Sequence, residues 1–184
     1  TILITNSCAR GRATPQSDLD LALLVPEGAT TDAVRALEAR WAAFMDQDEA
    51  VQDYLRSGRF AHIHADVITG VYTPTVWDDG GGPDAFELEV GNHVAYSAPF
   101  EALGPHFGAL QVRWLPYYDE ALRVARLTMV HDATLYDLDH VSFFLKRDLP
   151  FQAFDRLYKA HQELLQGLFI ARRTFPLAYN KWIH

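Results

Sequence analysis

Two aspartates near the start of the chain, Asp18 and Asp20, have a spacing that suits metal chemistry. They open the segment Asp-Leu-Asp-Leu-Ala-Leu-Leu-Val, residues 18–25, which begins by alternating and then becomes wholly apolar, as a strand does. Residues i and i+2 of a strand share a face, so the two carboxylates would lie roughly 7 Å apart along it. Bare carboxylates beside an apolar strand repel each other and are costly to desolvate. Mg²⁺ removes that cost, and proteins commonly hold it with one or two carboxylates plus substrate phosphates.

The loop before these aspartates contains the residue types that a phosphate group requires. Ser7 and Ser17 offer hydroxyl groups, and Arg10 or Arg12 offers a guanidinium. Gly11 and its small neighbours allow backbone N–H groups to approach an anion. The loop and the aspartates together predict a site for a metal-bound phosphate.

A third carboxylate, Asp66, lies in an alternating segment over residues 60–68 and would share a face with His62 and His64. Three carboxylates can hold two metal ions, one on a triphosphate and one that lowers the pKa of an attacking hydroxyl. Two histidines at i and i+2, with no cysteine or third histidine nearby, are a thin basis for zinc. We interpret them as exposed strand positions, with a supporting role around the metal as the alternative.

This order of residues resembles the signature of the DNA polymerase β-like nucleotidyltransferase superfamily. That signature is Gly-Ser, a short loop often containing Arg-Gly, then Ser-Asp-x-Asp, then a third acid on a later strand. The resemblance covers about the first third of the chain: Asn6-Ser7, Ala9-Arg10-Gly11, Ser17-Asp18-Leu19-Asp20 and Asp66. Asn6 stands where the family usually has Gly, and Asn tolerates the left-handed backbone region.

The resemblance implies roles for these residues. Asp18, Asp20 and Asp66 would be the catalytic and metal-binding residues, for two Mg²⁺ ions. Asn6, Ser7, Arg10 and Ser17 would bind the nucleotide, with ATP as substrate. Independently of the resemblance, Glu87 and Glu89 occupy alternating positions, and either is a candidate general base for the acceptor hydroxyl.

The length and the helical second half are similar to bacterial aminoglycoside-type adenylyltransferases and their uncharacterised relatives. The ending Phe-Pro-x-x-Tyr-Asn-Lys-Trp, residues 175–182, looks like a segment of those relatives, which implies that Lys181 reaches the triphosphate. The implied reaction moves a nucleoside monophosphate, AMP from ATP, to a hydroxyl of a small molecule. Two alternatives stay open: transfer to a protein or RNA partner, as in toxin–antitoxin systems, and a catalytically silent nucleotide-binding module, which Asn6 favours.

The elements that must position these residues divide the chain into an α/β part and a helical part. We expect strands over 2–5, 18–25, 60–68 and 71–77, a helix capped by Thr30 or Thr31, a shorter helix over 49–55, and a strand or short helix within 85–100. From Pro105 the pattern is helical, over 116–131, 134–147 and 150–173. The last of these has an apolar face with Phe151, Phe154, Leu157, Tyr158, Leu164, Leu165 and Leu168.

We therefore predict an α+β protein in two domains. Residues 1–104 would form a nucleotidyltransferase domain, with a small mixed sheet and flanking helices. Residues 105–184 would form a helical-bundle domain that binds the acceptor and closes over the nucleotide. Both ends of the sequence interrupt an expected pattern, so we expect the helical domain to be truncated here.

The composition limits the classes of binding partner and the cellular compartment that we expect. The chain of 184 residues has a formal net charge of -8, whereas affinity for nucleic acid phosphates depends on clustered Lys and Arg. Its single cysteine, Cys8, allows no intramolecular disulfide, which fits a reducing compartment. No apolar run reaches the length of a membrane span and no signal-peptide pattern opens the sequence, so we expect a cytoplasmic protein with no membrane contact. The oligomeric state is left open.

Overall fold

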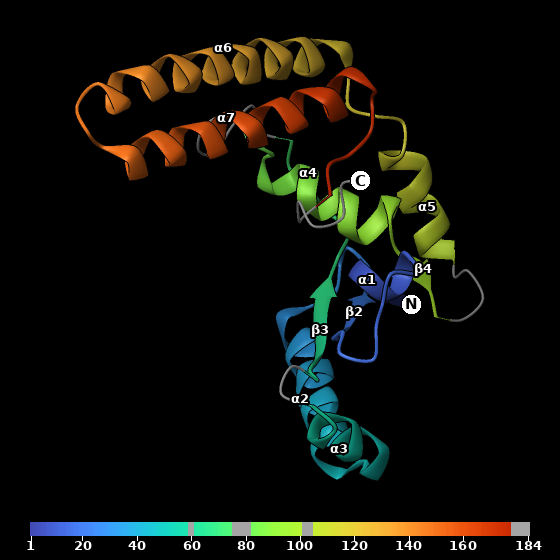
Figure 1. The fold of residues 1–184 in the computed structure, drawn as a ribbon. Helices are drawn as coiled ribbons and strands as arrows, with labels where there is room; N and C mark the ends of the chain where they lie inside the picture. Colours follow the sequence, from blue (N-terminus) through green and yellow to red (C-terminus); the bar gives the residue numbers. More distant parts are fainter. Residues whose placement is uncertain (59–60, 75–81, 101–104, 178–184) are drawn as a thin grey trace. The chain divides into compact units, whose positions relative to one another are not determined.

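The computed structural model describes residues 1–58, 61–74, 82–100 and 105–177, which belong to two compact units (Figure 1). Unit 1 comprises Thr1–Val71 and Asn92–Leu115, and unit 2 comprises Tyr72–Gly91 and Pro116–His184. Each unit is therefore assembled from two separate stretches of the chain. The division into functional domains at residues 104 and 105 stays a prediction.

Unit 1 is built on a four-stranded mixed sheet with the strand order β3-β2-β1-β4. The strands are β1 (Ile2–Ile4), β2 (Leu19–Leu24), β3 (Ile63–Ile68) and β4 (Ala98–Pro99). β1 pairs antiparallel with β2 and with β4, whereas β2 pairs parallel with β3. Leu3 and Ala22, in the two central strands, are fully buried. The predicted α+β class and small mixed sheet are confirmed, and the three strands predicted before residue 70 are present.

Two of the helices of unit 1 begin at a residue whose side chain caps them. The helices of the unit are α1 (Asn6–Ala9), α2 (Thr31–Gln47), α3 (Glu49–Arg56) and α5 (Pro105–Trp114), and a π-helix, η1 (Gly91–Ala95), leads into the second stretch of the unit. The Thr30 hydroxyl accepts a hydrogen bond from Ala33 N at 3.2 Å, which confirms the predicted cap of α2. Asp48 caps α3 in the same way, accepting from Val51 N at 3.0 Å.

The structure differs from the predicted elements in two segments after β3. The strand predicted over 71–77 is wrong for residues 71–74, where Pro74 has no N–H to donate to a ladder, and residues 75–77 lie outside the described residues. The ambiguous stretch 85–100 divides into α4 (Ala85–Val90), η1 and β4. Gly70 follows β3 and has a φ of +72°. A Cβ at this position would lie 2.5 Å from the Leu110 side chain of α5. Only glycine suits both constraints.

Unit 2 contains α4 and a helical hairpin of α6 (Glu120–Leu145) and α7 (Pro150–Ala171), which lie side by side and antiparallel (Figure 1). The two helices predicted over 116–131 and 134–147 are instead one continuous helix. No Gly or Pro interrupts residues 120–145, and the Thr134 hydroxyl donates to the Val130 carbonyl at 2.7 Å. That bond leaves Thr134 inside a helix rather than at a cap. Pro150 begins α7 as predicted.

A buried polar network joins the three helices of unit 2. Arg126 on α6 is fully buried, with Nε 3.2 Å from Asp84 Oδ2 and Nη2 3.2 Å from Glu87 Oε2. Glu87 also accepts from Gln166 of α7 at 2.9 Å and from the Tyr118 hydroxyl at 2.7 Å. Because Glu87 is fully buried in this network, we no longer consider it as a general base.

Glu163 on α7 is a further buried acid of unit 2, outside this network. It is 7 % exposed, and its Oε2 has no hydrogen-bond partner among the described residues. Burial raises its pKa to about 7; nearby Asp137 adds to the increase, and Lys159 and Arg156 oppose it. Asp137 accepts a hydrogen bond from Arg156 at 2.6 Å, so Glu163 is the less compensated acid of the two.

Glu163 should make the stability of the protein depend on pH. Its ordinary pKa is 4.5, so between pH 4.5 and about 7 the folded chain keeps a proton that the unfolded chain releases. Its contribution to stability is present below pH 4.5 and is lost as the pH rises through about 7, by roughly 1–3 kcal/mol in unfolding free energy. Urea unfolding from pH 4 to 9 would measure this loss. Glu163→Gln should flatten the profile and exposed Glu38→Gln should not; equal slopes in the two variants would contradict the prediction.

Among the described helices, none combines the length and the apolar composition that a membrane crossing requires.

Candidate metal centre

Backbone hydrogen bonds hold the two aspartates at the start of β2. Thr5 N donates to the Asp20 carbonyl and Leu19 N donates to the His62 carbonyl, both at 2.9 Å. The Cys8 thiol lies 3.6 Å from the Asp18 carbonyl oxygen. The main chain around both acids is thus tied to the end of β1, to the residues before β3 and to α1. Both aspartates are half-buried.

The structure brings Asp18, Asp20 and His64 together. One ligand atom from each of these three side chains lies within 4.8 Å of the others. His64 joins the group because the parallel pairing of β2 with β3 places it opposite Asp20, and residues opposite each other in this register project from the same face. His64 is exposed, as predicted, yet its place beside the acids is the feature that sequence reasoning undervalued.

Asp66 lies outside this close group. It is exposed, two residues beyond His64 on β3 and on the same face, and it is paired with Ala22 rather than with either aspartate. Its charge acts instead on His93, which follows α4: burial lowers the pKa of His93, and Asp66 opposes that shift. The role of Asp66 as a third ligand or as a base stays a prediction.

The loop between β1 and β2 contains the turn that the sequence predicts. Asn6 has a φ of 51° and Gly11 a φ of 63°, both in the left-handed region. Asn6 therefore adopts a conformation that glycine enters freely and that asparagine tolerates. Ser7 is buried, and its carbonyl accepts from Arg12 N at 2.9 Å, which closes the loop on itself.

Arg10 is the cation associated with this site. Burial lowers the pKa of its guanidinium, and Tyr96 and Asp20 oppose that shift, so its charge acts within reach of the Asp20 carboxylate. Arg12 is exposed, in agreement with a solvated loop residue. The phosphate contact predicted for Arg10 stays a prediction.

Ser17 has a structural role in the loop. Its hydroxyl accepts from Thr14 N at 2.9 Å, and its carbonyl accepts from the Tyr54 hydroxyl of α3 at 2.7 Å. These bonds fix the residue that immediately precedes Asp18. The phosphate contact predicted for Ser17 stays a prediction, and Lys181 lies outside the described residues.

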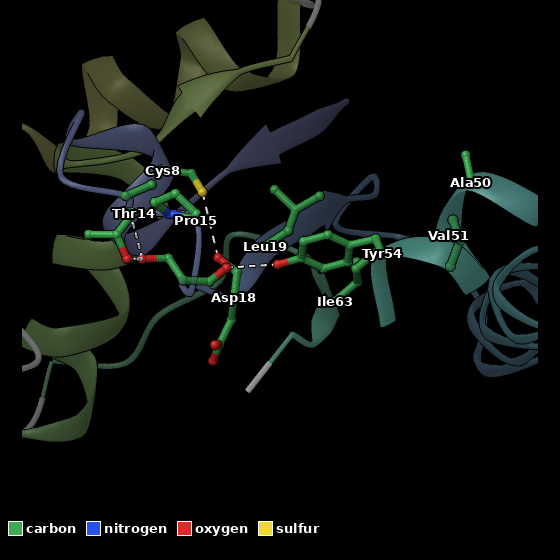
Figure 2. Close-up of a pocket in the computed structure, with 11 residues that line it drawn as sticks. Cys8, Thr14, Pro15, Asp18, Leu19, Ala50, Val51, Tyr54 and Ile63 are labelled. Carbon is green, nitrogen blue, oxygen red and sulfur yellow. Dashed lines mark hydrogen bonds between the residues drawn. The ribbon is translucent and has the colours of Figure 1, made fainter. Parts of the chain in front are cut away.

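A largely apolar cavity of about 460 Å³ borders the metal group (Figure 2). Leu19 and Ile63, which are paired across β2 and β3, line it together with Tyr54. Because strand residues alternate, the Leu19 and Ile63 side chains project from the face opposite Asp20 and His64. Figure 2 shows the Asp18 carboxylate pointing away from the Tyr54 ring. Asp18 itself lines the cavity, and the Tyr54 pKa is raised by burial first and then by the charge of Asp18.

Comparisons with models of protein families, with curated proteins and with solved structures found no match for this chain.

Proposed function

We propose that the protein is a metal-dependent nucleotidyltransferase that moves a nucleoside monophosphate, AMP from ATP, to a hydroxyl of a small molecule. The observation that carries this proposal is the group of Asp18, Asp20 and His64, whose ligand atoms lie within 4.8 Å of one another. A left-handed turn at Asn6 and the cation Arg10 precede that group. The combination suits a divalent cation with a polyphosphate.

The donor set fits a divalent cation. Two carboxylates suit Mg²⁺, and an imidazole nitrogen suits metals that accept nitrogen as well as oxygen, such as Mn²⁺. In this proposal Asp18 and Asp20 hold the cation, with His64 or Asp66 completing the site. Once bound, the cation supplies charge neutralisation at the triphosphate and acidification of the attacking hydroxyl.

The reaction forms a bond between the acceptor oxygen and the α-phosphorus and breaks the bond from that phosphorus to the bridging oxygen of pyrophosphate. The acceptor proton leaves to a base, for which Asp66 is our candidate because it is exposed on the same face as the metal group. Arg10 balances the charge of the phosphates. Such a site accelerates the reaction chiefly by positioning and by electrostatic stabilisation of the developing charge.

A catalytically silent nucleotide-binding module is one alternative. Asn6 adopts a φ of 51°, the left-handed conformation that glycine enters freely, so the backbone there is compatible with an active site. Transfer to a protein or RNA partner has no observation in its favour among the described residues. We therefore put forward the small-molecule acceptor alone.

A pyrophosphate-release screen tests the proposal. The protein is incubated with each of the four ribonucleoside triphosphates, with Mg²⁺ or Mn²⁺, and with pooled small-molecule hydroxyl acceptors. We expect release above that of Asp20→Ala, and we expect Asp53→Ala, at an exposed acid of α3, to behave as wild type. His64→Ala should lower activity more with Mn²⁺ than with Mg²⁺ if its imidazole binds the cation. Release no greater than that of Asp20→Ala under every condition would show the proposal to be wrong.

A further inference from the structure

Several large apolar side chains of α7 are exposed. Six of them share one side of the helix, spanning about 140° of its circumference at 100° per residue. Their exposed fractions lie between 47 % and 76 %: Phe151, Phe154, Leu157, Tyr158, Leu164 and Leu168. We call these six residues the outer face of α7. The sequence predicts them as an apolar face, and the structure leaves that face uncovered in unit 2.

The side of α7 that is buried in unit 2 has a different composition. It carries two alanines, two polar residues and one large apolar residue, namely Ala153, Ala160, Glu163, Gln166 and Ile170. The two helices are in contact along this side: a Cβ at Gly167 would lie 3.4 Å from the Val130 side chain of α6, at ordinary van der Waals distance. Most of the large apolar side chains of α7 thus lie on its exposed side, the reverse of an ordinary surface helix.

The partner helix exposes similar residues. Leu135, Tyr136, Leu138, Phe143 and Leu145 of α6 are each more than 40 % exposed. With large side chains of roughly 150–250 Å² each, about half exposed, the hairpin presents on the order of 1,000 Å² of apolar surface. Patches beyond a few hundred Å² are rare on monomeric soluble proteins and mark interaction surfaces.

We propose that a second copy of this chain covers this surface, so that two α6–α7 hairpins form a four-helix arrangement. Two long antiparallel helices are half of a four-helix bundle, and each helix of a bundle contacts two neighbours. The outer face of α7 is the second contact that one hairpin lacks. A stable interface needs about 800 Å² from each partner, which the hairpin can supply.

The charges on α7 are compatible with self-association. Each copy has a net charge of -8, which opposes dimerisation unless the contact itself is neutral. Along α7, which is described throughout, the side of the outer face includes His161 and the Tyr158 hydroxyl but no carboxylate and no Lys or Arg. Glu163 and Asp155 project from other sides of the helix. A two-fold contact between two outer faces of α7 would thus bring apolar rather than like-charged side chains together.

Size-exclusion chromatography with light scattering on the full chain tests the dimer, from low to high micromolar concentration. We expect a mass of twice 20.8 kDa for wild type and a single-chain mass for Phe154→Glu and for Leu164→Glu. These positions are 63 % and 55 % exposed, so glutamate there should leave the folded chain intact, which far-UV circular dichroism checks. The control is Val112→Glu on α5, 79 % exposed and outside the hairpin, which should remain dimeric.

Two results would overturn the dimer. One is a wild-type chain that stays monomeric at the highest concentration. This result overturns the dimer whether or not the chain binds neutral lipid vesicles. The other is a Phe154→Glu or Leu164→Glu variant that dissociates no more readily than Val112→Glu. If either glutamate variant loses helicity, it is replaced by Phe151→Ser, at the most exposed position of the outer face. The mass of the wild-type chain still decides whether the protein dimerises. The dimer does not depend on the proposed reaction.

Discussion

Alanine at Asp18 or at Asp20 should reduce nucleotidyl transfer to background while the protein stays folded. Either substitution removes a carboxylate from the group of ligand atoms that lie within 4.8 Å of one another. Loss of one preorganised electrostatic group typically lowers kcat by about 10²–10³-fold, and loss of the cation itself should exceed that. The hydrogen bonds recorded around both residues involve main-chain atoms, such as Thr5 N to the Asp20 carbonyl, and alanine retains them.

Steady-state transfer with the best nucleotide and acceptor from the screen gives the measurement, and urea unfolding of the same variants checks the fold. Asp18→Asn and Asp20→Asn keep the side-chain shape and should be nearly as inactive, because the charge rather than the volume holds the cation. Asp53→Ala is the matched control, since that acid is exposed and pairs with Arg56 on the surface of α3. Undiminished turnover in either alanine variant would refute the metal centre.

Replacing Arg126 with methionine should produce a large loss of stability. Arg126 is the cation of the network in unit 2, 3.2 Å from both Asp84 and Glu87, and its Nη2 donates to the Gly82 carbonyl at 2.6 Å. Methionine fills much of the same space but leaves two fully buried carboxylates without their cation. Breaking a buried ion pair in this way costs about 3–5 kcal/mol of unfolding free energy.

Arg123→Met on the same helix is the control for that loss. Arg123 pairs with Glu120, which is 55 % exposed, and pairs of this kind contribute at most about 1 kcal/mol. Urea unfolding followed by far-UV circular dichroism should therefore separate the two variants clearly. Adding Glu87→Gln to Arg126→Met should restore part of the stability, because it removes one of the uncompensated charges. Equal midpoints for Arg126→Met and Arg123→Met would contradict the role of the network.

Features that depend on a few neighbouring residues were accessible from the sequence. The alternation at Asp18 and Asp20 predicted a strand with both acids on one face, Thr30 predicted the start of α2, and Pro150 the start of α7. The left-handed turn at Asn6 follows from the side chain's tolerance of that conformation. In each case the deciding interaction spans four residues or fewer, so local pattern and structure agree.

Features that depend on which segments meet were decided by the tertiary structure alone. His64 joins the metal group because β3 pairs parallel with β2 in a register that sets it opposite Asp20, and the sequence of β3 alone does not specify that register. Glu87 became a buried network residue because α4 meets Arg126 of α6. From the sequence, the apolar residues of α7 would be expected in a core. In the hairpin, however, α7 buries mainly alanine and polar side chains and leaves six large apolar side chains exposed. Periodicity marks an apolar face, but the partner that covers it is set by contacts between residues far apart in the chain.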